Sequence, residues 1–303
     1  MKTTIQKNKT LKTINYTLFI SVLAILLQAC GSVPIIGRKQ LLLVPDQEVL
    51  TLSLQQYQDF IHNAPVEKNT SHARQVEQVG RRIAAAVETF YRNNGYESEL
   101  KNFNWEFNLV KSKDVNAFCM PGGKIVVYEG LLPITRDETG LAIVLGHEIA
   151  HAVAKHANER ISQQMALQYG GQIAGGLLGN NAAAQQIGGL VFGVGSQLGV
   201  MLPYSRKHEY EADELGLIFM AMAGYDPRAA VDFWTRMSQA AGGNSTLEVM
   251  STHPSDQNRI AKINEHMPEA LKYYQGAGVQ NKTEQKIKTS VKPKSRTSDK
   301  WSF

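Results

Sequence analysis

The sequence has 303 residues, of which 43% are hydrophobic and 19% are charged, a balance that is typical of globular proteins and excludes an intrinsically disordered chain. The formal net charge of +5 at pH 7 is concentrated at the two ends, because residues 1–29 carry +4 and residues 275–303 carry +5, which leaves −4 on residues 30–274. A mildly acidic body offers no basic surface to nucleic acid, so we expect no nucleic-acid partner.

Residues 1–29 predict a lipoprotein signal peptide. Four lysines precede the run LFISVLAILL, which is too short to span a bilayer, and LQAC then ends at Cys30. LQAC resembles the lipobox of bacterial lipoproteins, whose cysteine becomes the lipidated first residue; the alternative is a plain signal peptide with a chance cysteine. Gly31 after the cysteine favours, by the same resemblance, the outer membrane, so we expect a lipid anchor at its periplasmic face.

Residues 30–65 predict a lipidated tether and a first helix from about Asp46 to Ile61. Apolar residues then recur at helical spacing after Ser71, a candidate N-cap, and predict a second helix. The alternation in NFNWEFNLVK predicts a strand with one buried face. VNAFC, MPGGK and IVVYEG predict a strand, a Pro-Gly-Gly turn and a further strand.

The second half of the chain predicts a series of helices. Thr135 and Glu138 form a T-x-x-E capping box, which predicts a helix from there to about Tyr169. Residues 170–202 hold ten glycines and predict loosely packed short helices, a candidate lid over the buried helix before them, with plain packing as the alternative.

Three further helices and a tail complete the chain. Ser205 opens a helix that ends at Gly224, and Asp226 with Pro227 opens the next. A last helix follows THPSD. Residues 273–303 are rich in lysine, serine and threonine and predict a disordered basic tail.

The stretch HEIAH carries the strongest chemical signal. His147 and His151 are one helical turn apart, so both imidazoles can bind one Zn²⁺. Glu148 lies about 100° round the helix, where it reaches a metal-bound water. A chance match to H-E-x-x-H is expected roughly 0.01 times in a chain of this composition. The alternative, core histidines satisfied by the backbone, is therefore weaker.

Two histidines do not complete a catalytic zinc site. A metzincin needs Gly and His where this chain has Ala154 and Ala157, and no glutamate lies about twenty residues beyond His151. In EYEAD, however, Glu209 and Asp213 are four residues apart on one helical face. Glu209 is the candidate third ligand, and Asp213 the candidate hydrogen-bond partner that orients a ligand; two surface acids are the alternative.

The remaining side chains near these motifs are expected to be structural or exposed. Glu211 and Glu214 fall on other faces of their helix and are expected in solvent. His156 is expected on the opposite helical face from the metal ligands, and His208 away from the site. Cys119 is expected to be a small buried side chain, with a thiol switch on zinc as the alternative.

His253 in THPSD has two open interpretations. Near the zinc it would stabilise an oxyanion or act as a fourth ligand that silences the resting enzyme. A capping or core role is equally open.

NAFCMPGGKIVVYEGLL, GHEIAH and EYEAD, in this order and spacing, resemble the HtpX-like and CAAX-prenyl-endopeptidase-type zinc metallopeptidases, with the closest likeness to their soluble, lipid-anchored periplasmic branch. The resemblance covers about residues 66–270. It implies an α+β zincin-type fold over 66–272, mainly helical with a small, mostly antiparallel sheet beside the metal helix. Membrane-integrated relatives carry transmembrane helices, whereas LVFGVGSQLGVML is too short for one.

The resemblance also implies roles for the site residues. His147, His151 and Glu209 are the zinc ligands, with a water completing the tetrahedron. Zinc lowers the pKa of that water from about 15.7 towards 7. Glu148 takes the proton of the water as it attacks a peptide carbonyl and passes it to the leaving amine.

By the same resemblance, Asn116, Ala117 and Phe118 belong to an edge strand against which substrate lies extended, held by main-chain hydrogen bonds. We therefore expect a zinc endopeptidase that degrades misfolded or unassembled envelope proteins, the substrate class being implied by the family. The alternative is a zinc-stabilised chaperone or assembly factor with little proteolysis, against which the intact Glu148 argues. The sequence leaves the oligomeric state undetermined.

Overall fold

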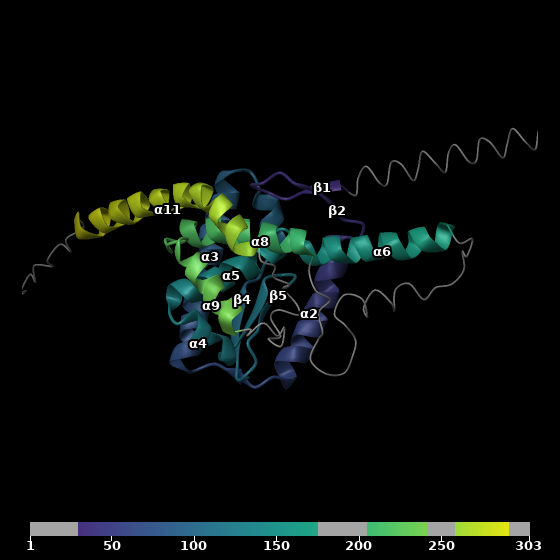
Figure 1. Ribbon diagram of the computed structural model, residues 1–303, viewed down its shortest axis with the longest axis horizontal. Coiled ribbons are helices and arrows are strands. Elements are labelled where there is room, and N and C mark those ends of the chain that lie inside the picture. The colour runs from purple at the N-terminus through teal and green to yellow at the C-terminus, as the bar shows by residue number, and fades with distance from the viewer. Residues whose placement is uncertain (1–29, 175–204, 241–257, 291–303) are drawn as a thin grey trace, which may run out of the picture.

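The computed structural model describes residues 30–174, 205–240 and 258–290 (Figure 1). The expected signal peptide, His253 and most of the glycine-rich segment lie outside these ranges. None of the helices within the ranges is long and apolar enough to cross a membrane.

The described part of the chain is mainly helical and contains two small sheets. The α-helices are α2 (Asp46–Asn63), α3 (Ser71–Asn93), α4 (Leu132–Thr135), α5 (Glu138–Val153), α6 (His156–Ala174), α8 (Arg206–Met222), α9 (Ala229–Ala240) and α11 (Arg259–Ser290). Two short 3₁₀ helices are η1 (Glu97–Asn102) and η2 (Glu129–Leu131). The strands are β1 (Cys30–Ser32), β2 (Lys39–Leu41), β3 (Val66–Glu67), β4 (Glu106–Val110), β5 (Ala117–Met120) and β6 (Lys124–Tyr128).

The larger sheet has the order β3-β4-β6-β5. Its outer pairings, β3 with β4 and β5 with β6, are antiparallel, and its central pairing, β4 with β6, is parallel. The predicted Pro-Gly-Gly turn between β5 and β6 is confirmed, and Gly122 and Gly123 take φ values of +90° and +78°, which favour glycine. β1 and β2 form a separate antiparallel hairpin. The mostly antiparallel sheet that the sequence predicted is therefore present.

Two predicted helix starts are wrong by one or two residues. α3 begins after Thr70, whose hydroxyl accepts a hydrogen bond from the backbone N–H of Ala73. α5 begins after Asp137, which caps the helix, so the expected box of Thr135 and Glu138 does not form. Thr135 belongs instead to the short α4, where its hydroxyl donates to a backbone carbonyl. In both cases a neighbouring side-chain oxygen, rather than the predicted one, accepts the hydrogen bond at the helix start.

Other boundaries agree more closely. α2 starts at Asp46 as predicted, and Ser205 caps α8 by accepting from the backbone of His208. α9 begins at Ala229, after a turn, rather than directly after Asp226. α11 continues to Ser290, which differs from the disorder expected from residue 273.

The helix expected to run to Tyr169 is broken in two. α5 ends at Val153, and Lys155 takes a left-handed φ of +55° before α6 begins at His156. The Lys155 ammonium forms ion pairs with Asp46 and Glu99, each at 2.7 Å. These partners from α2 and η1 accompany a backbone turn that costs about 1–3 kcal/mol in a non-glycine residue. Because of this break, α6 does not continue along the axis of α5, and the residues after Lys155 do not lie where a single helix would place them.

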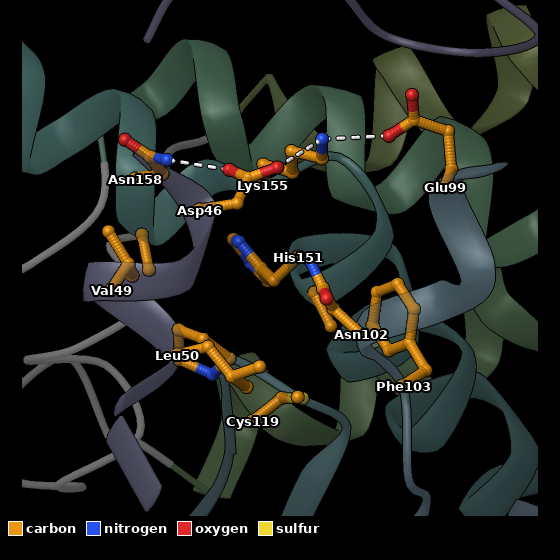
Figure 2. A pocket seen from close by; sticks show the side chains of 14 residues that line it. Asp46, Val49, Leu50, Glu99, Asn102, Phe103, Cys119, His151, Lys155 and Asn158 are labelled. Atoms are coloured by element: carbon orange, nitrogen blue, oxygen red, sulfur yellow. Dashed lines mark hydrogen bonds and ion pairs between the residues drawn. The ribbon is translucent and has the colours of Figure 1, made fainter. Parts of the chain in front are cut away.

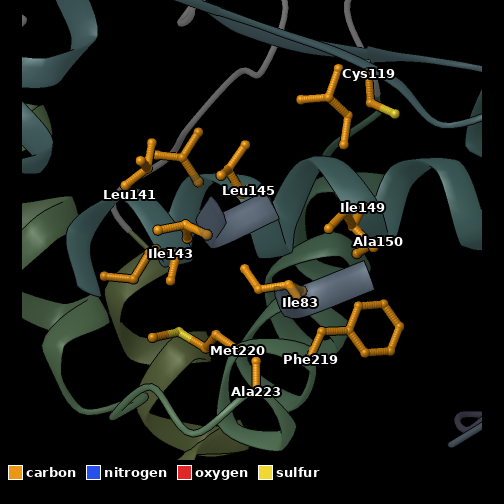
Figure 3. Packing of buried hydrophobic residues seen from close by; sticks show 14 of the residues in the cluster. Ile83, Cys119, Leu141, Ile143, Leu145, Ile149, Ala150, Phe219, Met220 and Ala223 are labelled. Atoms are coloured by element: carbon orange, nitrogen blue, oxygen red, sulfur yellow. The ribbon is translucent and has the colours of Figure 1, made fainter. Parts of the chain in front are cut away.

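α5 lies at the centre of the protein, packed against α3, α8, α9 and the strand β5 (Figure 1). Figure 3 shows Ile83 of α3 between the apolar side chains of α5 and those of Phe219 and Met220 on α8. Gly146 of α5 meets Gly216 of α8 at their backbones, since a Cβ on Gly216 would lie 2.9 Å from the backbone nitrogen of His147. The two glycines therefore bring the HEIAH helix and the EYEAD helix into close contact.

Candidate metal centre

Three buried side chains from α5 and α8 converge on one point. The Nε2 atoms of His147 and His151 are 3.0 Å apart. Carboxylate oxygens of Glu209 lie 3.5 Å from Nε2 of His147 and 3.4 Å from Nε2 of His151. All three side chains are buried, and their ligand atoms form one group of suitable size for a metal ion. The structure thus brings together the three ligands that the sequence predicted.

The donor set fits zinc. Ligand atoms held about 2.0–2.1 Å from a tetrahedral zinc lie about 3.3–3.4 Å from one another, and the three measured separations are close to this value. The Nδ1 atoms of His147 and His151 face other side chains, which leaves both Nε2 atoms directed at the same point as Glu209. Three such acceptors repel one another unless a cation lies between them.

The carboxylates of Asp213 and Glu209 favour positive charge at His147. Burial lowers this pKa, but the hydrogen bonds and negative charges of Asp213 and Glu209 raise it to about 9. Burial dominates at His151 and holds its pKa well below the ordinary value, so this imidazole is neutral and suited to bind a metal.

Asp213 holds His147 directly, as the sequence predicted. Its Oδ1 lies 2.9 Å from Nδ1 of His147. Arg259, at the start of α11, donates to both oxygens of Asp213 at 2.7 and 2.8 Å, and its guanidinium lies over the ring of Trp234. Burial raises the pKa of Asp213, but Arg259 and His147 outweigh it and hold that pKa below the ordinary value. His147 therefore faces an ionised carboxylate that is itself fixed by an arginine.

His151 is held through a second histidine. Nδ1 of His156 lies 2.8 Å from Nδ1 of His151, and Nε2 of His156 lies 2.9 Å from a carboxylate oxygen of Glu211. Burial lowers the pKa of His156 to about 4, so its ring is neutral. The expectation that His156 lies on the opposite helical face was wrong, because the break at Lys155 turns the ring back towards His151.

Glu211 and His208, expected to face away from the site, belong to the same buried network. Arg38, which precedes β2, donates to Glu211 and also to Glu159, with Nη atoms 2.8 and 2.6 Å from the Glu159 oxygens. Nε2 of His208 lies 3.1 Å from Glu159, and its ring stacks on His156. Glu211 is 5% exposed, so the predicted solvent position was wrong.

Glu148 is buried on α5, with 2% of its surface exposed. Cys119 on β5 is buried in the main core, as predicted. Burial raises the pKa of the Cys119 thiol well above the ordinary value, and the charge of Glu148 raises it further. Glu148 is therefore close enough to β5 for its charge to act on that thiol.

The predicted substrate strand is partly as expected. Ala117 and Phe118 belong to β5, whereas Asn116 lies just before it. Phe118 packs edge-on against Phe60 of α2, which covers one side of the strand. His253 lies outside the described residues, so its predicted role stays a prediction.

A cavity opens beside His151 (Figure 2). One rim carries Lys155 between Asp46 and Glu99. Its apolar wall is formed by Val49, Leu50, Phe103, Cys119 and Ala152. The metal ligand His151 therefore borders a cavity that has an apolar wall and a charged rim.

Sequence patterns missed six residues of the network, namely Arg38, His156, Glu159, His208, Glu211 and Arg259. His156 and Glu211 had a local signal, because each lies within five residues of a predicted ligand. Arg38 and Arg259 lie far from both motifs in the chain and carried no signal of this kind.

Comparison with known proteins gives a consistent family. Residues 71–267 match Peptidase family M48. The chain is 41% identical to the mitochondrial metalloendopeptidase OMA1 of Schizosaccharomyces pombe over 174 residues, which is 57% of this chain and 50% of the relative. It is 32% identical to the human mitochondrial metalloendopeptidase OMA1 over 245 residues, 79% of this chain and 46% of the relative.

A bacterial relative is also similar. The chain is 29% identical to the beta-barrel assembly-enhancing protease of Escherichia coli over 164 residues, covering 52% of this chain and 33% of the relative. The chain thus spans half or less of the length of these relatives. The similarity identifies the matched part as a metalloendopeptidase domain.

Proposed function

The chain belongs to peptidase family M48, and we propose that it is a zinc-dependent endopeptidase that hydrolyses peptide bonds of misfolded or unassembled envelope proteins. The observation that carries this proposal is the convergence of His147, His151 and Glu209 beside the buried Glu148. Zinc held by His147, His151 and Glu209 would supply a Lewis acid that polarises a peptide carbonyl and lowers the pKa of a water molecule.

Glu148 is the proposed general base. It follows His147 directly on α5 and is close enough to β5, the proposed substrate strand, for its charge to act on Cys119. Its carboxylate accepts a proton from the attacking water and delivers it to the leaving amine. Burial in the core keeps bulk water away from this transfer.

β5 is the proposed substrate strand, because within the described residues it forms an edge of its sheet. The backbone N–H of Tyr128 donates to the carbonyl of Asn116, so alternation along an antiparallel pair turns the main-chain groups of Asn116 and Phe118 towards β6. Ala117 and Cys119 then present theirs at the open edge. Substrate would therefore pair with Ala117 and Cys119, which moves the predicted contact by one residue.

The cavity beside His151 is proposed to hold the substrate side chain next to the scissile bond. It adjoins both the metal centre and Cys119 of the substrate strand. Its wall of Val49, Leu50 and Phe103 favours an apolar side chain, since burying apolar surface is favourable by about 25 cal/mol per Å².

We further propose that the protein belongs to the lipid-anchored periplasmic branch of the HtpX-like and CAAX-prenyl-endopeptidase-type peptidases, and is held by Cys30 at the outer membrane. The lipobox-like LQAC and the name of the Escherichia coli relative support this location and the envelope substrates. Incorporation of labelled palmitate that disappears in Cys30→Ala would support the anchor, and equal incorporation would refute it.

Degradation of fluorescent casein by the zinc-loaded protein tests the main proposal. Glu148→Gln should lower the rate by about 10²–10⁴-fold while zinc content stays the same. Glu97→Gln, an exposed glutamate on η1, is the matched control and should degrade casein at the wild-type rate. Equal rates for wild type and Glu148→Gln would end the peptidase proposal and favour the zinc-stabilised chaperone, detectable as suppressed aggregation without cleavage.

A further inference from the structure

We infer that His156 is a positioning residue for the metal ligand His151, and that Arg38 makes the N-terminal segment part of the metal centre by holding His156 through Glu211. The inference rests on the proposed metal centre. The contacts involved are those of His151 with His156 and of His156 with Glu211.

The proton positions along this chain of contacts follow from one requirement. If His151 binds metal through Nε2, its remaining proton is on Nδ1 and is donated to Nδ1 of His156, 2.8 Å away. His156 then accepts at Nδ1 and carries its own proton on Nε2, which it donates to Glu211 at 2.9 Å. Each donor meets one acceptor, and both imidazoles stay neutral. His156 thereby sets the tautomer and ring orientation of the ligand.

Arg38 fixes the far end of this chain. Its guanidinium donates to both oxygens of Glu211 and to both oxygens of Glu159, so one side chain clamps two carboxylates. Such two-point contacts define an orientation that a lysine ammonium cannot reproduce. Glu159 also meets His208, whose ring stacks on His156 with centroids 4.6 Å apart. His156 is therefore restrained both in its plane and across its face.

The N-terminal segment is attached at several points besides Arg38. Val33 is 1% exposed and belongs to the main hydrophobic core. The backbone N–H of Leu43 donates to the hydroxyl of Ser162 on α6 at 2.8 Å. The N-terminal segment, from Cys30 to Pro45, is thus packed onto the peptidase domain beside α6. His156 is the first residue of α6.

Because the network is buried, its ion pairs are poorly explained as contributions to the stability of the fold alone. His156 is fully buried, and Glu159 and Glu211 are 3% and 5% exposed. Buried ion pairs cost about as much in desolvation as they return in attraction, so they are weak contributors to stability. The carboxylate of Glu211 behind His156 also increases the basicity of His151 as a ligand.

The test compares full-length variants for two properties of the metal itself. Zinc affinity is measured by competition with a chelator, and ligand geometry by the visible absorption spectrum of the Co²⁺-substituted protein. His156→Leu should bind zinc about 10–100-fold more weakly and show an altered cobalt spectrum. His156→Gln should recover most of both, since its amide oxygen accepts from His151 and its amide nitrogen donates to Glu211.

Arg38→Met extends the test to the N-terminal segment and leaves the core residues in place. It should weaken zinc binding severalfold and shift the cobalt spectrum, with Arg38→Lys only partly restoring both. Arg81→Met is the control, because Arg81 forms an exposed ion pair with Glu77 on α3. Arg81→Met should match wild type.

Wild-type affinity and spectrum in folded His156→Leu would overturn the positioning role, and the same result in Arg38→Met would overturn the role of the N-terminal segment. If His156→Leu does not fold, Arg38→Met and the comparison of His156→Gln with wild type decide. The outcome is separable from that of the proposed function. A wild-type protein that binds zinc but does not cleave casein refutes only the peptidase proposal.

Discussion

The two histidines of the metal centre are supported in different ways. His147 contacts the carboxylate of Asp213 directly, and Arg259 holds that carboxylate from α11. His151 reaches its carboxylate, Glu211, only through His156. Both chains end in an arginine, but the first joins helices of the peptidase domain, whereas the second joins the domain to the N-terminal segment. We call Asp213 and Arg259 the direct support of His147, and His156, Glu211 and Arg38 the relayed support of His151. The direct support involves only helices of the peptidase domain, whereas the relayed support also depends on the N-terminal segment being packed in place.

The largest expected effect comes from removing either histidine ligand, because the metal then loses one of its three proposed protein ligands. His147→Ala and His151→Ala should each lose stoichiometric zinc and casein degradation. Metal content by atomic absorption measures this, with the exposed His72→Ala on α3 as control. A full equivalent of zinc in either variant would refute the ligand assignment.

Removing charge from the direct support should matter more than removing it from the relayed one. Asp213→Asn should weaken zinc binding by about 10–100-fold, because it changes the group that contacts His147 and leaves Glu209 as the ion-pair partner of the buried Arg259. Glu211→Gln acts through His156 and should have a smaller effect. Chelator competition measures both, with the exposed Asp232→Asn as control. A larger effect of Glu211→Gln would reverse the comparison.

The contact of α5 with α8 positions the direct support. Gly216→Ala places a methyl group 2.9 Å from the backbone nitrogen of His147, so the helices must separate. We expect a loss of about 1–3 kcal/mol in the free energy of unfolding, measured in urea, together with weaker zinc binding. Unchanged stability would show that the helix contact adapts without cost.

The smallest expected effect is on the stability of the protein at low pH, through Glu159, which contacts Arg38 of the relayed support. Burial raises the pKa of Glu159, but His208 and Arg38 outweigh it and lower that pKa to about 2. Its contribution is therefore complete above the ordinary carboxyl pKa and is lost as the pH falls towards 2. The stability advantage of wild type over Glu159→Gln should shrink between about pH 4.5 and pH 2, followed by thermal unfolding. Parallel curves would contradict the assignment.

Local pattern was sufficient for the proposed metal ligands and for Asp213. His147 and His151, like Glu209 and Asp213, are four residues apart, and a helix places such pairs on one face whatever surrounds it. The strands and most helices followed from the same periodicity. Two caps were missed, because Thr70 caps α3 in place of its neighbour Ser71, and Asp137 caps α5 in place of Thr135. Hydrogen-bonding side chains that compete for one helix end differ by little in energy.

The sequence by itself determined the chemistry of this protein, because the spacing of HEIAH and EYEAD specifies three donors and a base on two helices. Only the tertiary structure decided what supports those donors. The left-handed turn at Lys155 depends on partners from α2 and η1, and it directs His156 back to His151. Arg38 reaches Glu211 across 173 residues of chain. Contacts of that kind depend on how separate segments pack, and no local pattern encodes them.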